Sequence, residues 1–226
     1  MRRVFIATIL GCVVLASAGR ASAATVTVDP AASWNGFMNV FELPANGGAF
    51  VFGSGWGTAD LVATFSGDVL TLKPNSVNDV STFWYQGGGA PGNPGNKIME
   101  ANMYVEATNT LSGQTVTFEG NVLANSLTSA HSAVVFIKDF APDYSSHVPV
   151  TIPVTPGPFT ISLNTLPGAG RHVQYGFAMT GPNVWITDVA PFGSVQVTAI
   201  PEPMSLALAG AGLLGIVAIR RRGLRR

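Results

Sequence analysis

Residues 98–106 read Ile-Met-Glu-Ala-Asn-Met-Tyr-Val-Glu, and this stretch decides the fold class. Apolar side chains occupy every second position from Met99 to Val105, and Glu100, Asn102, Tyr104 and Glu106 stand between and after them. Successive side chains of a β-strand point to opposite faces, so this period of two predicts a strand with one buried face and one solvated face. Such strands are typical of antiparallel sheets that cover a core on one side.

The same alternation recurs on both sides of this stretch, in 159–163, 172–180 and 195–199. Short apolar segments bounded by Gly and Pro predict further strands at 25–28, 49–52, 61–65, 69–73, 80–85, 115–123, 133–139 and 148–154. About a dozen short strands with turn signals between them predict an all-β fold, an antiparallel two-sheet sandwich. A jelly-roll-like arrangement is the first choice and an immunoglobulin-like sandwich the second. The sequence has no internal repeat of roughly 20–50 residues, which would be the pattern of a propeller or a solenoid.

The N-terminus has the pattern of a secretory signal peptide. Arg2 and Arg3 precede an uncharged, mostly apolar run over 4–18, and Ala21-Ser22-Ala23 fits the small-residue cleavage pattern. We therefore predict that residues 1–23 are a signal peptide and that the mature chain begins at Ala24.

The C-terminus has three consecutive parts. Pro201-Glu202-Pro203 is followed by an uncharged stretch over 204–219 and then by a basic cluster that begins with Arg220, Arg221 and Arg222. As a helix the uncharged stretch would measure roughly 24 Å, at about 1.5 Å per residue. The hydrocarbon core of a bilayer is about 30 Å thick, so the stretch predicts one short transmembrane helix. The arginines would remain on the cytoplasmic side.

This tail resembles the PEP-CTERM sorting signal of exported bacterial proteins, which the membrane peptidase exosortase processes. The resemblance covers 200–226 and implies that Pro201, Glu202 and Pro203 are the sorting motif and that Arg220, Arg221 and Arg222 stop transfer through the membrane. It also implies an exosortase-type peptidase as a partner. The inner membrane would be a transient location, before the cell envelope or the extracellular space. An ordinary single-pass anchor would have the same topology without the cleavage.

The segment between the two signals, 24–199, is predicted to be one acidic domain. It contains four basic residues, Lys73, Lys97, Lys138 and Arg171, against 11 acidic ones, which gives a formal charge of −7. An acidic surface repels phosphate backbones, so nucleic acid is excluded as a partner. The sole cysteine, Cys12, lies in the signal peptide, so the mature domain has no disulfide. A domain of about 175 residues can bury enough apolar surface to fold without one.

Three aromatic residues are candidate ligand contacts. Trp84 and Tyr85 stand directly before a loop over 86–97 that holds five glycines and two prolines, and Trp56 lies in a glycine-rich turn. Aromatic rings stack on the apolar faces of sugars, and long loops on sandwiches often line a ligand face. Because neighbouring strand residues point to opposite faces, only one of Trp84 and Tyr85 could face a ligand. Rings that fill a sandwich core are the alternative.

Catalytic and metal-binding patterns are weak. His131, His147 and His172 lie far apart, and Glu100 and Glu106 on one strand would be roughly 20 Å apart at about 3.3 Å per residue. That separation is too large for a glycosidase pair, and Glu119 is the other carboxylate that could partner either one. We therefore expect no enzyme, no catalytic residue, no bound metal and no cofactor. Calcium is the one ion that loop carboxylates such as Asp139 and Asp143 would suit.

Two classes of function remain. The first is a non-catalytic exported protein of the cell envelope or extracellular matrix, with exopolysaccharide as the expected ligand. The segment 176–197 is similar to the closing strands of carbohydrate-binding jelly rolls, and proteins with a tail of this kind are typical of bacteria that make exopolysaccharide. The second class is a secreted glycoside hydrolase or lyase on a jelly-roll fold.

Overall fold

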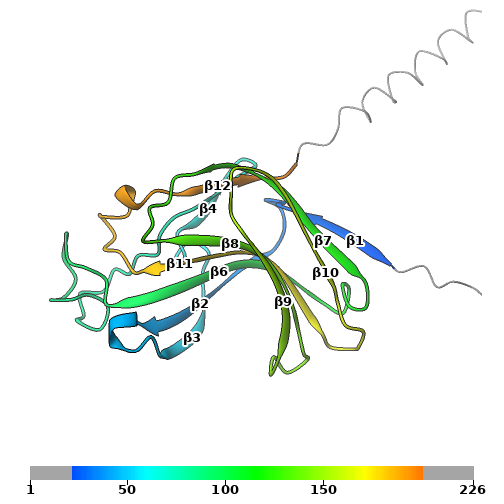
Figure 1. Ribbon diagram of the computed structural model, residues 1–226, viewed down its shortest axis with the longest axis horizontal. Coiled ribbons are helices and arrows are strands. Elements are labelled where there is room, and N and C mark those ends of the chain that lie inside the picture. Colours follow the sequence, from blue (N-terminus) through cyan, green and yellow to red (C-terminus); the bar gives the residue numbers. More distant parts are fainter. Residues whose placement is uncertain (1–21, 201–226) are drawn as a thin grey trace, which may run out of the picture.

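The structure, a computed structural model, describes residues 22–200 (Figure 1). Within this range twelve strands form two six-stranded sheets, and two short 3-10 helices lie outside the sheets. This confirms the predicted all-β, two-sheet architecture. The signal peptide up to residue 21, the motif Pro201-Glu202-Pro203, the expected transmembrane helix and the arginine cluster lie outside the described residues. In the described part of the chain, no helix is long and apolar enough to cross a membrane.

The first sheet, sheet A, is organised around β7 (Thr115–Asn125). β10 (Gly157–Asn164) pairs along one edge of β7. β1 (Ala23–Thr27) and β12 (Val195–Thr198) pair with successive parts of its other edge. β5 (Val69–Leu72) and β4 (Ala63–Ser66) continue the sheet beyond β12. The pairing of β1 with β7 is parallel, whereas the other strand pairings described are antiparallel.

The second sheet, sheet B, is antiparallel throughout. Its order is β3 (Phe50–Trp56), β2 (Trp34–Glu42), β6 (Lys97–Thr108), β11 (His172–Pro182), β8 (Ser132–Phe140) and β9 (His147–Pro153). The central strands β6 and β11 are the two stretches with the clearest alternation in the sequence. The 3-10 helices η1 (Pro44–Asn46) and η2 (Ala190–Phe192) lie in loops that connect strands.

The core lies between the two sheets. Phe118 of β7 is fully buried, and its ring contacts the rings of Phe159, Tyr175 and Phe177 from both sheets. On β11 the residues Val173, Tyr175, Phe177 and Met179 all belong to this core cluster. Burying each large side chain contributes roughly 1.5–3 kcal/mol, so the core holds the sheets together without a disulfide. Because the odd-numbered residues of β11 face the core and side chains alternate along a strand, the even-numbered residues face the outside of sheet B.

Two parts of the predicted strand pattern are wrong. The segment 80–85 contains a turn at 82–84 and one isolated bridge between Tyr85 and Gly95, instead of a strand. Conversely, β2 was not predicted. Its inward side chains Met38 and Val40 alternate with outward ones that include Phe37 and Phe41, so apolar residues on both faces obscure the period of two.

Candidate functional site

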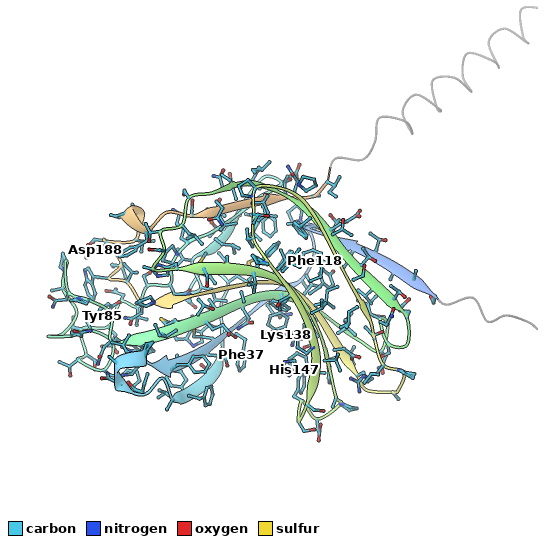
Figure 2. The ribbon with its side chains drawn as sticks, in the orientation of Figure 1. Phe37, Tyr85, Phe118, Lys138, His147 and Asp188 are labelled. Carbon is cyan, nitrogen blue, oxygen red and sulfur yellow. The ribbon has the colours of Figure 1, made fainter. Side chains whose placement is uncertain are left out.

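The outer face of sheet B is hollowed into a groove of about 840 Å³. Side chains from β2, β6, β11, β8 and β9 line it. Figure 2 shows Phe37, Lys138 and His147 on this side of the sheet, whereas Phe118 lies between the sheets. Concave sites of this volume, with apolar walls and a few polar groups, are the usual form of ligand pockets. We refer to this hollow as the sheet B groove.

The floor of the groove is low because β11 carries small residues there. Gly176 pairs with Tyr104 on one side and Phe136 on the other, and Ala178 pairs with Asn102 and Val134. A Cβ atom at Gly176 would collide with backbone atoms of Met103 and Tyr104. The small side chains of β11 thus leave space between the larger ones of β6 and β8.

A polar cluster crosses this floor from β8 to β2. Lys138 Nζ donates a hydrogen bond to Asn102 Oδ1 at 2.8 Å, so its side chain spans the intervening strand β11. Asn102 Nδ2 donates to Glu100 Oε1 at 3.0 Å, and Asn39 Nδ2 donates to the same oxygen at 3.0 Å. Nζ also lies 4.3 Å from the centre of the Phe136 ring, which is fully buried beneath it. Side chains from three strands are thereby held in fixed positions.

A second cluster surrounds Glu106. Tyr144 donates its hydroxyl to Glu106 Oε1 at 2.9 Å, and Gln174 Nε2 donates to Oε2 at 2.7 Å. His172 Nδ1 lies 3.4 Å from Glu106 Oε1 and 2.8 Å from the Thr108 hydroxyl. Both oxygens of this carboxylate therefore already have donors within the protein.

Tyr144 reaches Glu106 because of the loop at 141–146, between β8 and β9. Its amide donates to Ala141 O, and Asp143 Oδ1 accepts bonds from the amide and hydroxyl of Ser145, so the loop is tightly turned. Tyr144 adopts a positive φ of 57°, which is uncommon outside glycine and directs the ring back over the sheet. The ring stacks on His172 with the centroids 4.3 Å apart.

Burial and neighbouring charges change the ionisation of these groups. Burial raises the pKa of Tyr144 to about 12, with further contributions from its hydrogen bond to Glu106 and from the Glu106 charge. Its hydroxyl is therefore protonated at neutral pH and acts as a donor. Burial lowers the pKa of Lys138, and the charge of Glu100 opposes that shift. Burial likewise raises the pKa of Tyr104 on the groove wall.

Two of the aromatic residues predicted to contact a ligand, Trp84 and Tyr85, do not line the groove. Tyr85 is fully buried and Trp84 is 8% exposed, so neither ring has a free face. The Tyr85 hydroxyl lies 2.6 Å from Val77 O and 2.9 Å from Val184 O, and it accepts a bond from the Val77 amide. The structure therefore does not fit the hypothesis that either ring stacks on a ligand. Because segment 80–85 is not a strand, Trp84 and Tyr85 do not point to opposite faces, and both rings turn inward.

Trp56 is partly buried in the same region. Its ring packs edge-on against Trp84 with the centroids 6.4 Å apart, and its Nε1 donates to the Ser54 hydroxyl. Trp56 also lines two shallow hollows, and it shares one of them with the groove residues Asn35, Phe37 and Tyr104. We call Trp56, Trp84, Tyr85 and Trp185 the end cluster; Tyr85 lies far from Lys138 and His147 in Figure 2.

The glycine-rich loop that follows Tyr85 is held more firmly than its composition suggests. Asp188 Oδ2 accepts a bond from the Gly92 amide at 2.6 Å, and Asn93 Nδ2 donates to Gly88 O. Gln86 and Asn93 line a smaller hollow of about 520 Å³ together with Trp185 and His131. Burial lowers the pKa of His131. This hollow is the place where the predicted loop could contact a small molecule.

Several carboxylates considered for catalysis or calcium have other positions or partners. Glu119 lies on β7 in sheet A, so it cannot pair with Glu100 or Glu106 in sheet B, contrary to the sequence-based suggestion. Asp139 is fully buried, accepts a bond from Arg171 Nε at 2.9 Å and another from the Leu166 amide at 2.7 Å. Among residues 22–200, no group of three or more His, Cys, Asp or Glu side chains has the arrangement of a metal site.

Sequence reasoning did not identify most of the groove. Asn39 lies on the unpredicted strand, and Lys138, Tyr144 and Gln174 had no role assigned. The available signal was the solvated face of the predicted strands 98–106 and 172–180, where Glu100, Asn102, Glu106 and Gln174 stand. Polar side chains on the outer face of a sheet are half-buried where the sheet forms a hollow. The sequence does not show this burial, because it depends on strands that are distant along the chain.

The fold and the groove define a β-sandwich protein with an open polar site on one sheet. A PEP-CTERM protein-sorting motif matches residues 199–222. The chain therefore carries the sorting signal of an exosortase substrate and is an exported protein, processed at the membrane. No curated protein and no solved structure matches the chain significantly.

Proposed function

We propose that this is a non-catalytic protein of the cell envelope or extracellular matrix that binds exopolysaccharide in the sheet B groove of a jelly-roll-like sandwich. The observation that carries the proposal is the groove itself, in which amide and carboxylate groups are held in place between aromatic walls. Polysaccharides present hydroxyl groups around rings with apolar faces, so they need both kinds of contact.

The polar groups are suitably prepared for such a ligand. Asn39 and Gln174 each donate one side-chain hydrogen bond to a carboxylate, and Asn102 is bonded through both its nitrogen and its oxygen, so the orientation of all three amides is fixed. Fixed side chains lose little entropy when a ligand binds. The partly exposed ring of Phe37 stands on the β2 side, and Phe140 and Tyr144 stand on the β8 side. A sugar chain lying along the groove would meet rings on both sides and amides beneath.

The position of the groove also suits a protein sorted through its tail. The described chain starts at Ser22, beside β1, and ends at Ile200, just after β12, and both strands belong to sheet A (Figure 1). The groove is on the outer face of the other sheet. Attachment or processing at either end of the chain would leave the groove open to polymer.

The test compares two phenylalanines of the same hairpin. Phe37 lines the groove, whereas Phe50 on β3 is 60% exposed and is not among the groove residues. We expect Phe37→Ala to weaken binding of the full-length chain to immobilised bacterial polysaccharides by about tenfold, which corresponds to about 1.4 kcal/mol. Phe50→Ala should bind as the unaltered protein does. Biolayer interferometry over a panel of neutral and acidic polymers measures both. Absence of binding to every polymer, or equal binding by the two variants, would contradict the proposal.

A secreted glycoside hydrolase or lyase is the second candidate, favoured by the Glu106 cluster. Glu106, Tyr144 and His172 bring three groups that can carry protons to one end of the groove. Glycosidase carboxyl pairs are about 5–9.5 Å apart, whereas Glu100 and Glu106 are six positions apart on β6, roughly 20 Å. Incubation with a bound polymer separates the candidates. New reducing ends or unsaturated uronates would indicate the enzyme, and unchanged chain length would favour the binding protein.

A further inference from the structure

Lys138 is a half-buried cation that forms no salt bridge in the described chain, although the charge of Glu100 favours its protonated form. Salt bridges within 4.0 Å link Lys97 to Glu42 and Arg171 to Asp139, but none involves Lys138. Its one hydrogen bond among the described residues goes to the neutral amide of Asn102. A lysine ammonium has three donors, so two N–H groups have no hydrogen-bond partner among the described residues. A charge that is removed from water without a counter-ion is unfavourable, and an anion bound beside it would relieve that cost.

Neither carboxylate that lines the groove lies within salt-bridge distance of Lys138. Glu100 Oε1 accepts bonds from the side chains of Asn39 and Asn102. Glu106 accepts bonds from Tyr144 and Gln174 on its two oxygens. Both oxygens of Glu106 and one oxygen of Glu100 thus have amide or hydroxyl donors within the protein. Lys138 is the sole lysine or arginine among the described residues that line the groove.

The placement of Lys138 suits contact with a ligand. The side chain crosses the small residues of β11 and rests on Phe136, so Nζ stands near the middle of the floor. The Asn102 bond and the ring beneath restrict its movement. An anionic group that entered the groove would meet an ammonium already held in position, which reduces the entropic cost of binding.

We propose that the sheet B groove takes an acidic polysaccharide, with one anionic sugar held against Lys138 and neutral sugars on either side of it. This inference rests on the proposed function. Glu100 and Glu106 lie on β6 on either side of Asn102, which Lys138 contacts, so an anion placed beside either carboxylate would be repelled. The domain as a whole also carries a formal charge of −7, which repels a densely charged polymer. Both facts favour a chain in which acidic residues are spaced apart.

The first experiment uses the unaltered full-length chain and a matched pair of polymers. Gellan carries uronic acid residues separated by neutral sugars, and reduction of its carboxyl groups removes the charge while the chain remains. Biolayer interferometry should show native gellan binding about tenfold more tightly than the carboxyl-reduced form. Polygalacturonate, which is charged on every residue, should bind more weakly than native gellan. Equal affinity for native and reduced gellan would overturn the inference.

The second experiment uses variants. Lys138→Met keeps the stem over Phe136 but removes the charge, and we expect it to bind native and reduced gellan equally. Lys138→Arg should preserve the preference for native gellan, and Lys73→Met, at an exposed position outside the groove, should behave as the unaltered protein does. Thermal melting checks that each variant folds. If Lys138→Met does not fold, the comparison of native and carboxyl-reduced gellan on the unaltered chain still tests whether the protein prefers an acidic polymer.

The results distinguish the inference from the proposed function. Tight binding of neutral polymers that Phe37→Ala weakens, without a preference for native gellan, would keep groove binding and overturn the acidic ligand. Absence of binding to any polymer would overturn both. A preference for native gellan that survives in Lys138→Met would move the anion to another site and overturn the role of Lys138.

Discussion

The end cluster and the sheet B groove contain similar residue types and use them differently. In the end cluster the Tyr85 ring is fully buried and its hydroxyl bonds to backbone atoms of Val77 and Val184. In the groove the Tyr144 ring is 48% exposed and its hydroxyl bonds to the side chain of Glu106. A tyrosine whose partners are backbone atoms fastens loops to a sandwich. The Tyr144 hydroxyl instead fixes the position of a carboxylate on an open surface.

The largest effect should come from removing a ring of the end cluster. Tyr85→Ala deletes a fully buried ring that packs edge-on against Trp185, and should lower the free energy of unfolding by about 3–5 kcal/mol. The matched change Tyr144→Ala removes a half-exposed ring and should cost much less. Urea denaturation of both variants measures the difference. Similar losses would mean that the two regions do not differ as described.

The Tyr85 hydroxyl should contribute a smaller part of that effect. Tyr85→Phe leaves the Val77 amide and the carbonyls of Val77 and Val184 without this partner inside the protein. An unsatisfied buried polar group costs about 1–3 kcal/mol, so we expect a loss in that range. Thermal melting at neutral pH gives the measurement. A melting temperature equal to that of the unaltered protein would show that the hydroxyl does not fasten the loop.

Removing an aromatic wall of the groove should affect stability less than binding. Phe37→Ala removes a ring that is only partly buried, so the free energy of unfolding should fall by about 1 kcal/mol. The same variant is expected to bind polysaccharide about tenfold more weakly. Denaturation and binding measured on one preparation compare the two effects. A loss of stability as large as that of Tyr85→Ala would identify Phe37 as a core residue.

The smallest effect should be a change in how tyrosines ionise. Burial raises the pKa of Tyr85, whereas the pKa of Tyr144, at about 12, also depends on Glu106. Glu106→Gln removes that charge, so the pKa of Tyr144 should fall towards its usual value of about 10. The pKa of Tyr85 should remain unchanged. Ultraviolet titration of phenolate absorbance measures both, and Tyr144→Phe identifies the transition that belongs to Tyr144.

The same titration carries a consequence for stability. The folded chain retains the Tyr144 proton at a pH where the unfolded chain loses it. The contribution of Tyr144 to the free energy of unfolding is therefore complete below about pH 10. It declines as the pH rises from about 10 to about 12. In Glu106→Gln this decline should occupy a narrower range of pH. An unaltered alkaline profile in that variant would contradict the role of Glu106.

Most strands were predictable because they depend on neighbouring positions. The alternation in 98–106 and 172–180 identified β6 and β11, and the turn residues separated them from the next strands. The strand β2 was missed because Phe37 and Phe41 make its outer face partly apolar. The segment 80–85 was wrongly predicted as a strand because its aromatic residues fill the end of the sandwich and do not line a sheet.

The site was less predictable than the fold. Glu100, Asn102 and Glu106 were recognised as the polar face of one strand, but nothing local links them to Asn39 or Gln174. Trp84 and Tyr85 were predicted as ligand contacts because they precede a long loop rich in glycine and proline. Their burial depends on Val77, Asn183 and Val184, which lie elsewhere in the chain and close over them.

The sequence by itself determined the all-β class and the sorting signal, because both are patterns of adjacent residues that can be read without knowledge of contacts. Tertiary structure alone decided which aromatic rings are buried and where the sheet B groove lies. Lys138 and Asn102 are 36 positions apart and meet because β11 lies between their strands with small residues on that face. Contacts of this kind arise from strand order and register, which long-range pairing establishes.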